Sequence, residues 1–324
     1  LGKLLKGIDL VDKAVLSSRK RTAEKTPGGF FIKVVYQGDP IASIPIRIQI
    51  TPQDWLRYAR SSGNQKVQIE YLKRAIAMNP EDANVRRMLA SLYFRTGMTG
   101  EAIAQYRAIL SQKPNDPAIL AELARCYLKI ERYEEAIRYA ERSAKANPRD
   151  DSVLADLASA WGQLGNWEKA IHYYLASLKL RPDNPVALFK LGEAYEKTGR
   201  LPEATEQYRR VLEKVPKADH VAAALASVSL RMGKFDEAIR WHLEVLKRQP
   251  KNAAVYGNLG VAYGGKGLVK EEMESYRKAI ELNPKDPVVR FNLAAALEKA
   301  KKEQEAIREY GKVLELKPND ADAM

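Results

Sequence analysis

Apolar residues recur along most of the chain at the spacing of an amphipathic α-helix, and the helices come in pairs that each end at a proline. The stretch from Leu191 to Pro216 contains two such helical segments on either side of a short turn. The closing prolines follow one another at a constant interval of 34 residues, and they are Pro80, Pro114, Pro148, Pro182, Pro216, Pro250, Pro284 and Pro318. This period predicts eight copies of one helix-turn-helix unit, stacked into an elongated body.

Each unit can be numbered so that its closing proline is position 32, which makes Ala83 position 1 of the second unit. Position 7 is leucine from the second unit onward, and aromatic residues are frequent at position 11 and at position 24 of the second helix. Position 8 is always small in these units: Ala90, Ala124, Ala158, Gly192, Ala226, Gly260 and Ala294. Small residues let two helices approach closely, and aromatic rings fill the space beside them. These positions are therefore the predicted core.

The ends of the predicted helices carry their own signals. Asp116-Pro117, Asn184-Pro185 and Asp286-Pro287 each place a capping side chain before a proline that starts a helix, as Thr51-Pro52 does in the first unit. Position 15, where the first helix must stop, is glycine in five units: Gly97, Gly165, Gly199, Gly233 and Gly267. Glu131 and Lys301 replace this glycine in two units, where a left-handed backbone would cost each about 1 kcal/mol.

Residues 1–50 do not follow the repeat. Apolar residues between Leu1 and Val15 have helical spacing and predict a short amphipathic helix, followed by a basic linker up to residue 29. From Phe30 to Ile50 apolar and polar residues alternate around a turn, which predicts a β-hairpin with Pro45 at an edge or a bulge. The predicted divisions are residues 1–29, 30–50 and 51–324.

The 34-residue pattern resembles the tetratricopeptide repeat family, over roughly residues 49–320. The resemblance implies an all-α fold, a right-handed α-solenoid of helix pairs, here preceded by the short helix and the β-hairpin. In this family the first helix of each pair lines a concave groove that binds peptides or partner proteins. The hairpin itself is similar to the last strands of bacterial surface β-sandwich modules, which suggests that it ends such a module.

The family's groove positions are 2, 5, 6, 9, 12 and 13 of the first helix. Carried over to this chain, they imply a partner-binding set of Arg87, Arg95, Arg125, Lys129, Phe189, Lys190, Asn258, Phe291 and Asn292. The arginines of the early units suit an acidic peptide. The small residues of the seventh unit, flanked by two phenylalanines, suit close backbone approach and a hydrophobic side chain.

The seventh unit departs from the pattern at position 20, where Glu272 stands in place of alanine, and its first helix is rich in glycine. A buried carboxylate without a partner is costly. We therefore expect a local rearrangement in this unit, with Met273 turned inward instead of Glu272.

Composition and charge narrow the function. The chain has 45% hydrophobic residues, which is typical of a globular protein, and no apolar run long enough to span a membrane. Its single cysteine excludes an internal disulfide, and its three histidines lack the spacing of metal ligands. We find no phosphate-binding loop and no nucleophile with a base nearby. The sequence therefore predicts a protein that is not an enzyme and that needs no cofactor and no metal.

Two functions of different class remain open. The first is a scaffold that binds an extended or helical segment of a protein partner, which would be acidic. The second is a structural protein that assembles into homo-oligomers or filaments through the open ends of the solenoid and the hairpin. Nucleic-acid binding ranks below both, because the net charge of +13 comes from basic residues that alternate with acids. The β-segment favours the bacterial cell envelope or the extracellular space, with the cytoplasm as the alternative.

Overall fold

The structure is a computed structural model that describes residues 30–36, 39–46 and 51–317. The chain divides into two compact units, Leu1–Glu81 and Asp82–Met324. The predicted amphipathic helix and basic linker lie outside the described residues. The predicted boundary at residue 51 also differs from this division, since the first helix pair belongs to the first unit.

The first unit contains two antiparallel strands, β1 (Phe30–Tyr36) and β2 (Asp39–Ile46), at the place of the predicted hairpin. Phe30 pairs with Ile46, and the register shifts between Val34 and Val35. Pro45 pairs with Phe31 in the regular part of the ladder, so the irregularity is not at the proline. In the sheet of these two strands each strand has an open edge, where a residue without an N–H is tolerated.

The first unit also contains the first helix pair, α2 (Pro52–Ser61) and α3 (Gln65–Met78). Thr51 caps α2 through a reciprocal pair of hydrogen bonds with Asp54, which satisfies two backbone donors at the helix start. Trp55 is buried between the helices, and its ring centroid lies 5.4 Å from that of Tyr71. The most divergent repeat of the sequence thus still forms a packed helix pair.

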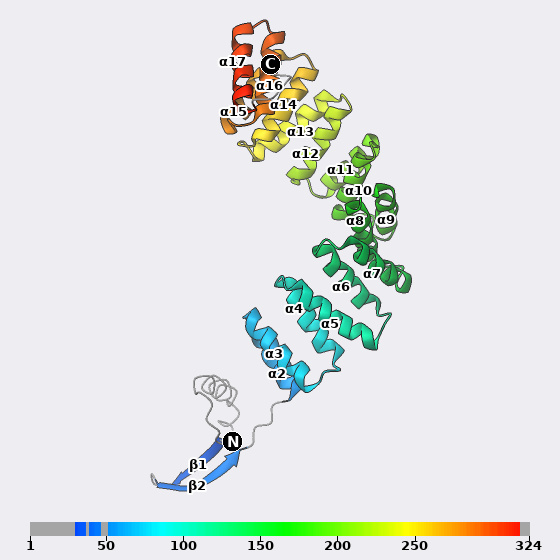
Figure 1. The fold of residues 1–324 in the computed structure, drawn as a ribbon, viewed down its shortest axis with the longest axis vertical. Coiled ribbons are helices and arrows are strands. Elements are labelled where there is room, and N and C mark those ends of the chain that lie inside the picture. Colours follow the sequence, from blue (N-terminus) through cyan, green and yellow to red (C-terminus); the bar gives the residue numbers. More distant parts are fainter. Residues whose placement is uncertain (1–29, 37–38, 47–50, 318–324) are drawn as a thin grey trace. The chain divides into compact units, whose positions relative to one another are not determined.

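The described residues of the second unit form seven helix pairs (Figure 1), in which we call the first helix of each pair the A helix and the second the B helix. The A helices are α4 (Ala83–Arg95), α6 (Pro117–Lys129), α8 (Asp151–Gln163), α10 (Pro185–Lys197), α12 (Asp219–Arg231), α14 (Ala253–Gly265) and α16 (Pro287–Lys299). The B helices are α5 (Thr99–Gln112), α7 (Tyr133–Ala146), α9 (Trp167–Leu180), α11 (Leu201–Lys214), α13 (Phe235–Arg248), α15 (Val269–Leu282) and α17 (Glu303–Leu316).

The predicted packing between A and B helices is confirmed. The leucines of position 7 and the alanines of positions 8 and 20 are buried. At the two glycines of position 8 there is no room for a side chain: a Cβ on Gly192 would lie 2.4 Å from the ring of Tyr208, and one on Gly260 would lie 2.5 Å from that of Tyr276. A small residue at position 8 therefore leaves the space into which the position-24 ring packs.

The predicted helix ends are confirmed as well. Asp116, Asn184 and Asp286 each accept two backbone N–H groups at the start of a helix whose first residue is proline. The five predicted glycines at position 15 have positive φ. Glu131 and Lys301 adopt the same left-handed conformation, with φ of 60° and 56°, although both carry a Cβ.

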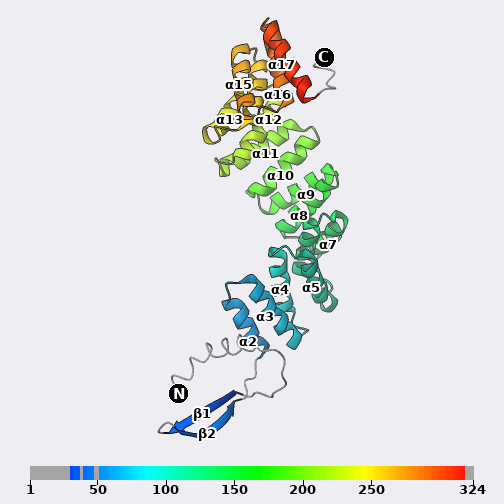
Figure 2. The same cartoon turned by 60° about the vertical axis from the view of Figure 1, so that its left-hand side comes forward.

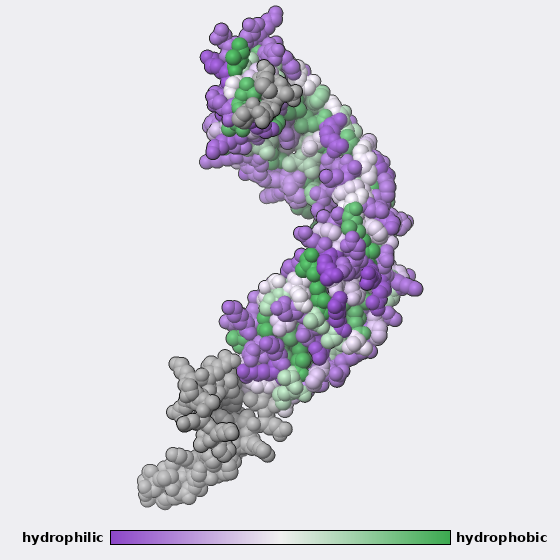
Figure 3. Space-filling view, viewed as in Figure 1, coloured by the Kyte–Doolittle hydropathy of each residue, from purple (hydrophilic) through white to green (hydrophobic). Residues whose placement is uncertain are grey.

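Successive pairs of the second unit stack in chain order from α4 to α17, as Figures 1 and 2 show. Each B helix packs on the next A helix, and neighbouring A helices also contact each other, for example α6 with α8 and α12 with α14. These contacts put the A helices on the inner, concave side of the stack. Hydrophilic residues cover most of the visible surface of this unit, with smaller hydrophobic patches between them (Figure 3).

Candidate functional site

A cavity of about 360 Å³ opens where three successive A helices, α8, α10 and α12, come together with α9. Its lining residues are Ser159, Gly162, Gln163, Trp167, Tyr174, Lys190, Glu193, Glu196, Lys197 and Arg231. All the residues from the A helices occupy positions 6, 9, 12 or 13 of their repeats. The positions that the sequence assigns to the groove therefore do meet around one cavity in this part of the chain.

The charges of this cavity are mostly paired. Lys190 donates to Glu193 at 2.6 Å, and Arg231 of α12 donates to Glu196 of α10 at 3.1 Å. The Tyr208 hydroxyl also donates to Glu196, at 2.6 Å. Lys197 is exposed and has no ion pair among the described residues. Three cations and two acids thus surround the cavity, and the excess positive charge is on Lys197.

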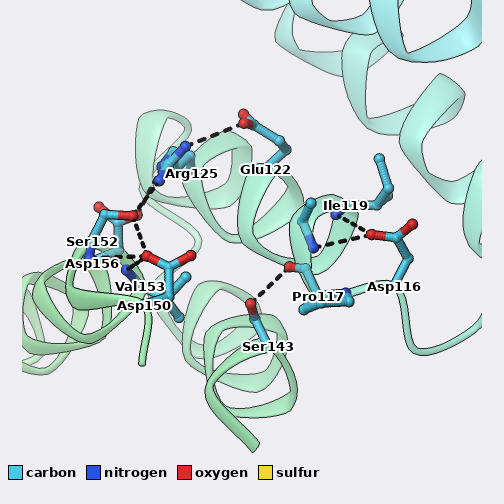
Figure 4. A network of polar contacts seen from close by, with 11 residues as sticks. Asp116, Pro117, Ile119, Glu122, Arg125, Ser143, Asp150, Ser152, Val153 and Asp156 are labelled. Carbon is cyan, nitrogen blue, oxygen red and sulfur yellow. Dashed lines mark hydrogen bonds and ion pairs between the residues drawn. The ribbon is translucent and has the colours of Figure 1, made fainter. Parts of the chain in front are cut away.

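Arg125 of α6 lies at the centre of a polar network that joins two A helices (Figure 4). Its Nε donates to Asp156 at 2.9 Å, and its Nη2 donates to Ser152 at 2.9 Å, both on α8. Its Nη1 donates to Glu122 of its own helix at 3.2 Å. Asp150 accepts the Ser152 hydroxyl at 2.7 Å, so three carboxylates gather around one guanidinium.

The network changes the expectation for Arg125. Burial raises the pKa of the Asp156 carboxyl, while the charge of Arg125 acts in the opposite direction. The guanidinium is therefore needed to hold a half-buried carboxylate, and its donors are already used inside the protein. Arg125 ties α6 to α8, and the concave surface at this point is acidic rather than basic.

The other cations predicted for the early repeats are more open. Arg87 and Arg95 on α4 are exposed. Lys129 of α6 reaches back to α4, where its Nζ donates to the carbonyl oxygen of Phe94 at 2.9 Å and lies 4.5 Å from the centre of the Phe94 ring. Arg87 and Arg95 are thus the cations that α4 presents to solvent.

The two predicted phenylalanines are part of the packing between helices. The Phe189 ring of α10 contacts Tyr208 of α11, the B helix of the same pair, and His220 of α12. The centroid distances are 5.6 and 5.0 Å. The Phe291 ring meets Tyr310 edge-on at 5.5 Å. Both are only half-exposed. These phenylalanines of position 5 therefore pack on the position-24 tyrosines, and only the remaining part of each ring is available to a ligand.

Asn258 on α14 is exposed and Asn292 on α16 is half-buried. Two glycines at the end of α14 lie against side chains of other helices. A Cβ on Gly264 would lie 2.5 Å from Oε1 of Glu272, and one on Gly265 would lie 2.2 Å from the Phe235 ring. These glycines make room for side chains of neighbouring helices.

The predicted rearrangement of the seventh repeat is wrong. Glu272 keeps its inward position and is only 5% exposed, and Met273 is buried beside it in a regular α15. The missing side chain of Gly264 supplies the space for the carboxyl group, so the helix pair needs no distortion.

Several residues of the cavity were not singled out from the sequence: Ser159, Gln163, Glu196 and Arg231. They stand at positions 9, 13, 12 and 13, so applying the same position rule to every repeat would have found them. The pairing of Arg231 with Glu196 joins two repeats, and no rule within one repeat could have predicted it.

Family models of the tetratricopeptide repeat match most of the second unit and the end of the first, at residues 69–117, 96–161, 155–219, 223–287 and 275–308. The chain is a tetratricopeptide repeat protein. No curated protein matches it in sequence. Its repeats are of a fold that typically serves as a scaffold for protein–protein interaction, and nothing in the described residues indicates catalysis.

Solved tetratricopeptide repeat structures share this fold. The C-terminal part of a repeat-containing protein from Cytophaga hutchinsonii aligns over 72% of this chain and 96% of its own, with 18% identity and a TM-score of 0.64. MamA from Desulfovibrio magneticus RS-1 aligns over 53% of this chain and 97% of its own, with 21% identity and a TM-score of 0.51. YrrB, described as having an unusual peptide-binding site, aligns over 57% and 95%, with 15% identity and a TM-score of 0.51.

Two further observations concern the described residues. None of their helices is long and apolar enough to cross a membrane. Their histidine, cysteine and acidic side chains form no group of three or more that could hold a metal ion.

Proposed function

We propose that the concave side of the second unit binds an extended segment of a partner protein, and that this makes the chain an interaction scaffold. The observation that carries the proposal is the cavity shared by α8, α10 and α12. Its lining comes from equivalent positions of three consecutive A helices, as a site for a segment running along the stack requires. YrrB, which has the same fold, is described as having an unusual peptide-binding site.

The charge of the cavity favours an acidic side chain in the partner at this point. Lys190 and Arg231 are paired with glutamates, and Lys197 remains exposed without an ion pair in the described structure. A carboxylate beside Lys197 would balance the excess charge and gain charge-assisted hydrogen bonds. Arg87 and Arg95 offer a second basic region on α4, whereas Arg125 belongs to the acidic network between them.

Reversal of the unpaired charge tests this proposal. Peptides would be selected from a random displayed library on the full chain, and their affinities measured by calorimetry. We expect Lys197→Glu to weaken the selected peptides roughly tenfold, because attraction to an acidic side chain becomes repulsion. The matched control is Lys179→Glu, the same charge change at an exposed lysine on the outer helix α9, which should leave affinity unchanged. Equal affinities for both variants would contradict binding at the cavity.

Self-assembly is the second candidate, and one residue of α17 favours it. Ile307 stands at position 21 and is 68% exposed, whereas the isoleucines at the same position in α5, α7 and α9, Ile103, Ile137 and Ile171, are buried. An exposed isoleucine at a position that is buried in these other repeats suits contact with an apolar surface, such as that of another copy of the chain.

Light scattering after size-exclusion chromatography, over a hundredfold range of concentration, tests this candidate. We expect the wild-type mass to rise with concentration and Ile307→Asp to remain a monomer, because a charge in an apolar contact is costly. Lys312→Asp, on an exposed part of the same helix, controls for the added charge. A wild-type chain that stays monomeric throughout the range would exclude self-assembly through α17.

A further inference from the structure

The seventh repeat carries an acid in an unusual place. Glu272 is at position 20 of the B helix α15, where six of the other seven repeats have alanine, the first has glutamine, and none has an acid. The carboxyl group fills the space that a side chain on Gly264 would take, with Oε1 2.5 Å and Oε2 3.0 Å from the place of its Cβ. Gly264 is position 12 of the A helix α14. The carboxyl group of this B-helix residue thus occupies the space that the side chain at position 12 of the A helix would otherwise fill.

Position 12 normally provides its own side chain, and in two repeats this is glutamate. Glu196 of α10 accepts from the Tyr208 hydroxyl at 2.6 Å, and Glu298 of α16 accepts from the Tyr310 hydroxyl at 3.3 Å. In both repeats position 20 is alanine, Ala204 and Ala306. The seventh repeat has the reverse combination, glycine at position 12 and glutamate at position 20, and so keeps a carboxylate beside its own tyrosine, Tyr276.

The fifth repeat shows what such a carboxylate can hold. Arg231, at position 13 of the following A helix, donates to Glu196 at 3.1 Å, and both residues line the concave cavity. The corresponding residue after the seventh repeat is Lys299 of α16. Lys299 is exposed, and its charge acts on Glu272, yet the two form no ion pair. The ion pair that joins the acid of the fifth repeat to the next A helix is thus missing at the seventh.

The carboxyl group of Glu272 therefore remains available to a further partner. It is 5% exposed and makes no hydrogen bond or ion pair within the described part of the chain. Burial raises the pKa of this carboxyl group, against the opposing charge of Lys299. A cationic group that reaches it from the concave side would remove an energetic cost and gain a charge-assisted hydrogen bond.

We propose that Glu272, reached over Gly264, is an anionic subsite for a lysine or arginine side chain of the bound segment. This inference rests on the proposed function, since it assigns part of the same concave surface. It predicts a partner segment of mixed charge, with a carboxylate at the cavity of α8, α10 and α12 and a cation further along the stack.

Peptide selection on the full chain tests the inference. We expect peptides selected on the wild type to carry lysine or arginine at one fixed position, and replacement of that residue by glutamine to weaken binding roughly tenfold. On Glu272→Gln, which keeps the size of the side chain, the same replacement should have no effect. The matched control is Glu271→Gln, at the exposed acid next to it on α15, which should behave as wild type.

A second variant makes the test independent of whether Glu272→Gln folds well. The exchange Gly264→Glu with Glu272→Ala reproduces the combination found in the fifth and eighth repeats, and we expect it to keep the preference for a cation. Loss of the preference in this exchange, or its persistence in Glu272→Gln, would overturn the inference. Selected peptides without any preference for a cation would also overturn it and leave the proposed function standing. Failure to select any peptide would refute both.

Discussion

At the scale of single residues, Glu131 and Lys301 show that the backbone requirement of the repeat is stronger than the preference of the residue. Both have positive φ at position 15, where the other turns of the second unit use glycine. The hydrogen bonds of the turn still form, for example from the Arg132 N–H to the carbonyl of Tyr127 at 2.9 Å. The sequence predicts this strain correctly, because the 34-residue period fixes the turn whatever residue stands there.

Replacing Glu131 by glycine should stabilise the protein. Removal of the Cβ relieves a left-handed conformation that costs about 1 kcal/mol, partly offset by the greater freedom of glycine in the unfolded chain. The midpoint of urea unfolding would rise accordingly. Glu131→Ala is the control, since it removes the charge and keeps the Cβ, and a rise of equal size in that variant would show that backbone strain is not the cause.

A second residue, His242, concerns pH. It is fully buried on α13 at position 24, where five other repeats have tyrosine, and neither of its ring nitrogens has a hydrogen-bond partner in the structure. Burial lowers its pKa from 6.5 to about 4. A histidine with a lowered pKa in the folded state stabilises the protein above pH 6.5, and this contribution is lost as the pH falls towards 4.

The expected loss between pH 7.5 and pH 5 is about 2 kcal/mol of unfolding free energy from this one group. His242→Leu should remove that part of the pH dependence, which urea unfolding at the two pH values would measure. His172→Leu, at an exposed histidine on α9, should leave the pH dependence as in wild type. An unchanged difference between the two pH values in His242→Leu would contradict the assignment.

At the scale of helices, the sequence predicts what lies inside one repeat far better than what joins two repeats. The core positions, the caps and the turns follow from spacing, and the structure confirms them. The partners of Arg125 lie 27 and 31 residues away on the next A helix, so its role depends on which side chains two different repeats happen to bring together. Its position in the repeat predicts a partner-binding role for Arg125, whereas the hydrogen bonds of its side chain connect α6 to α8.

The seventh repeat shows the same limit within one helix pair. Glu272 taken alone is a buried charge, and Gly264 taken alone is a weak point of a helix. Only together do they form a fitting pair, because the space left by one residue is filled by the other. The sequence contained both signals, but a prediction made position by position had no means to combine them.

At the scale of the whole second unit, each helix pair contacts mainly the pairs before and after it. Such a stack has no central core, and its stability is a sum over repeats and their interfaces. The candidate site is likewise a series of local surfaces along the stack, and these surfaces differ from one another in charge. The differences between repeats determine which of these surfaces a partner uses. The family pattern does not specify those differences.

The locality of these contacts also determines how affinity would accumulate. A segment that rests only on α8 to α12, or only on α14 to α16, makes one weak attachment. A segment long enough to reach both places makes the second attachment at a high effective concentration, so that two modest affinities multiply. The spacing between the charged residues of a ligand would then matter as much as their identity, and the stack would select ligands by that spacing.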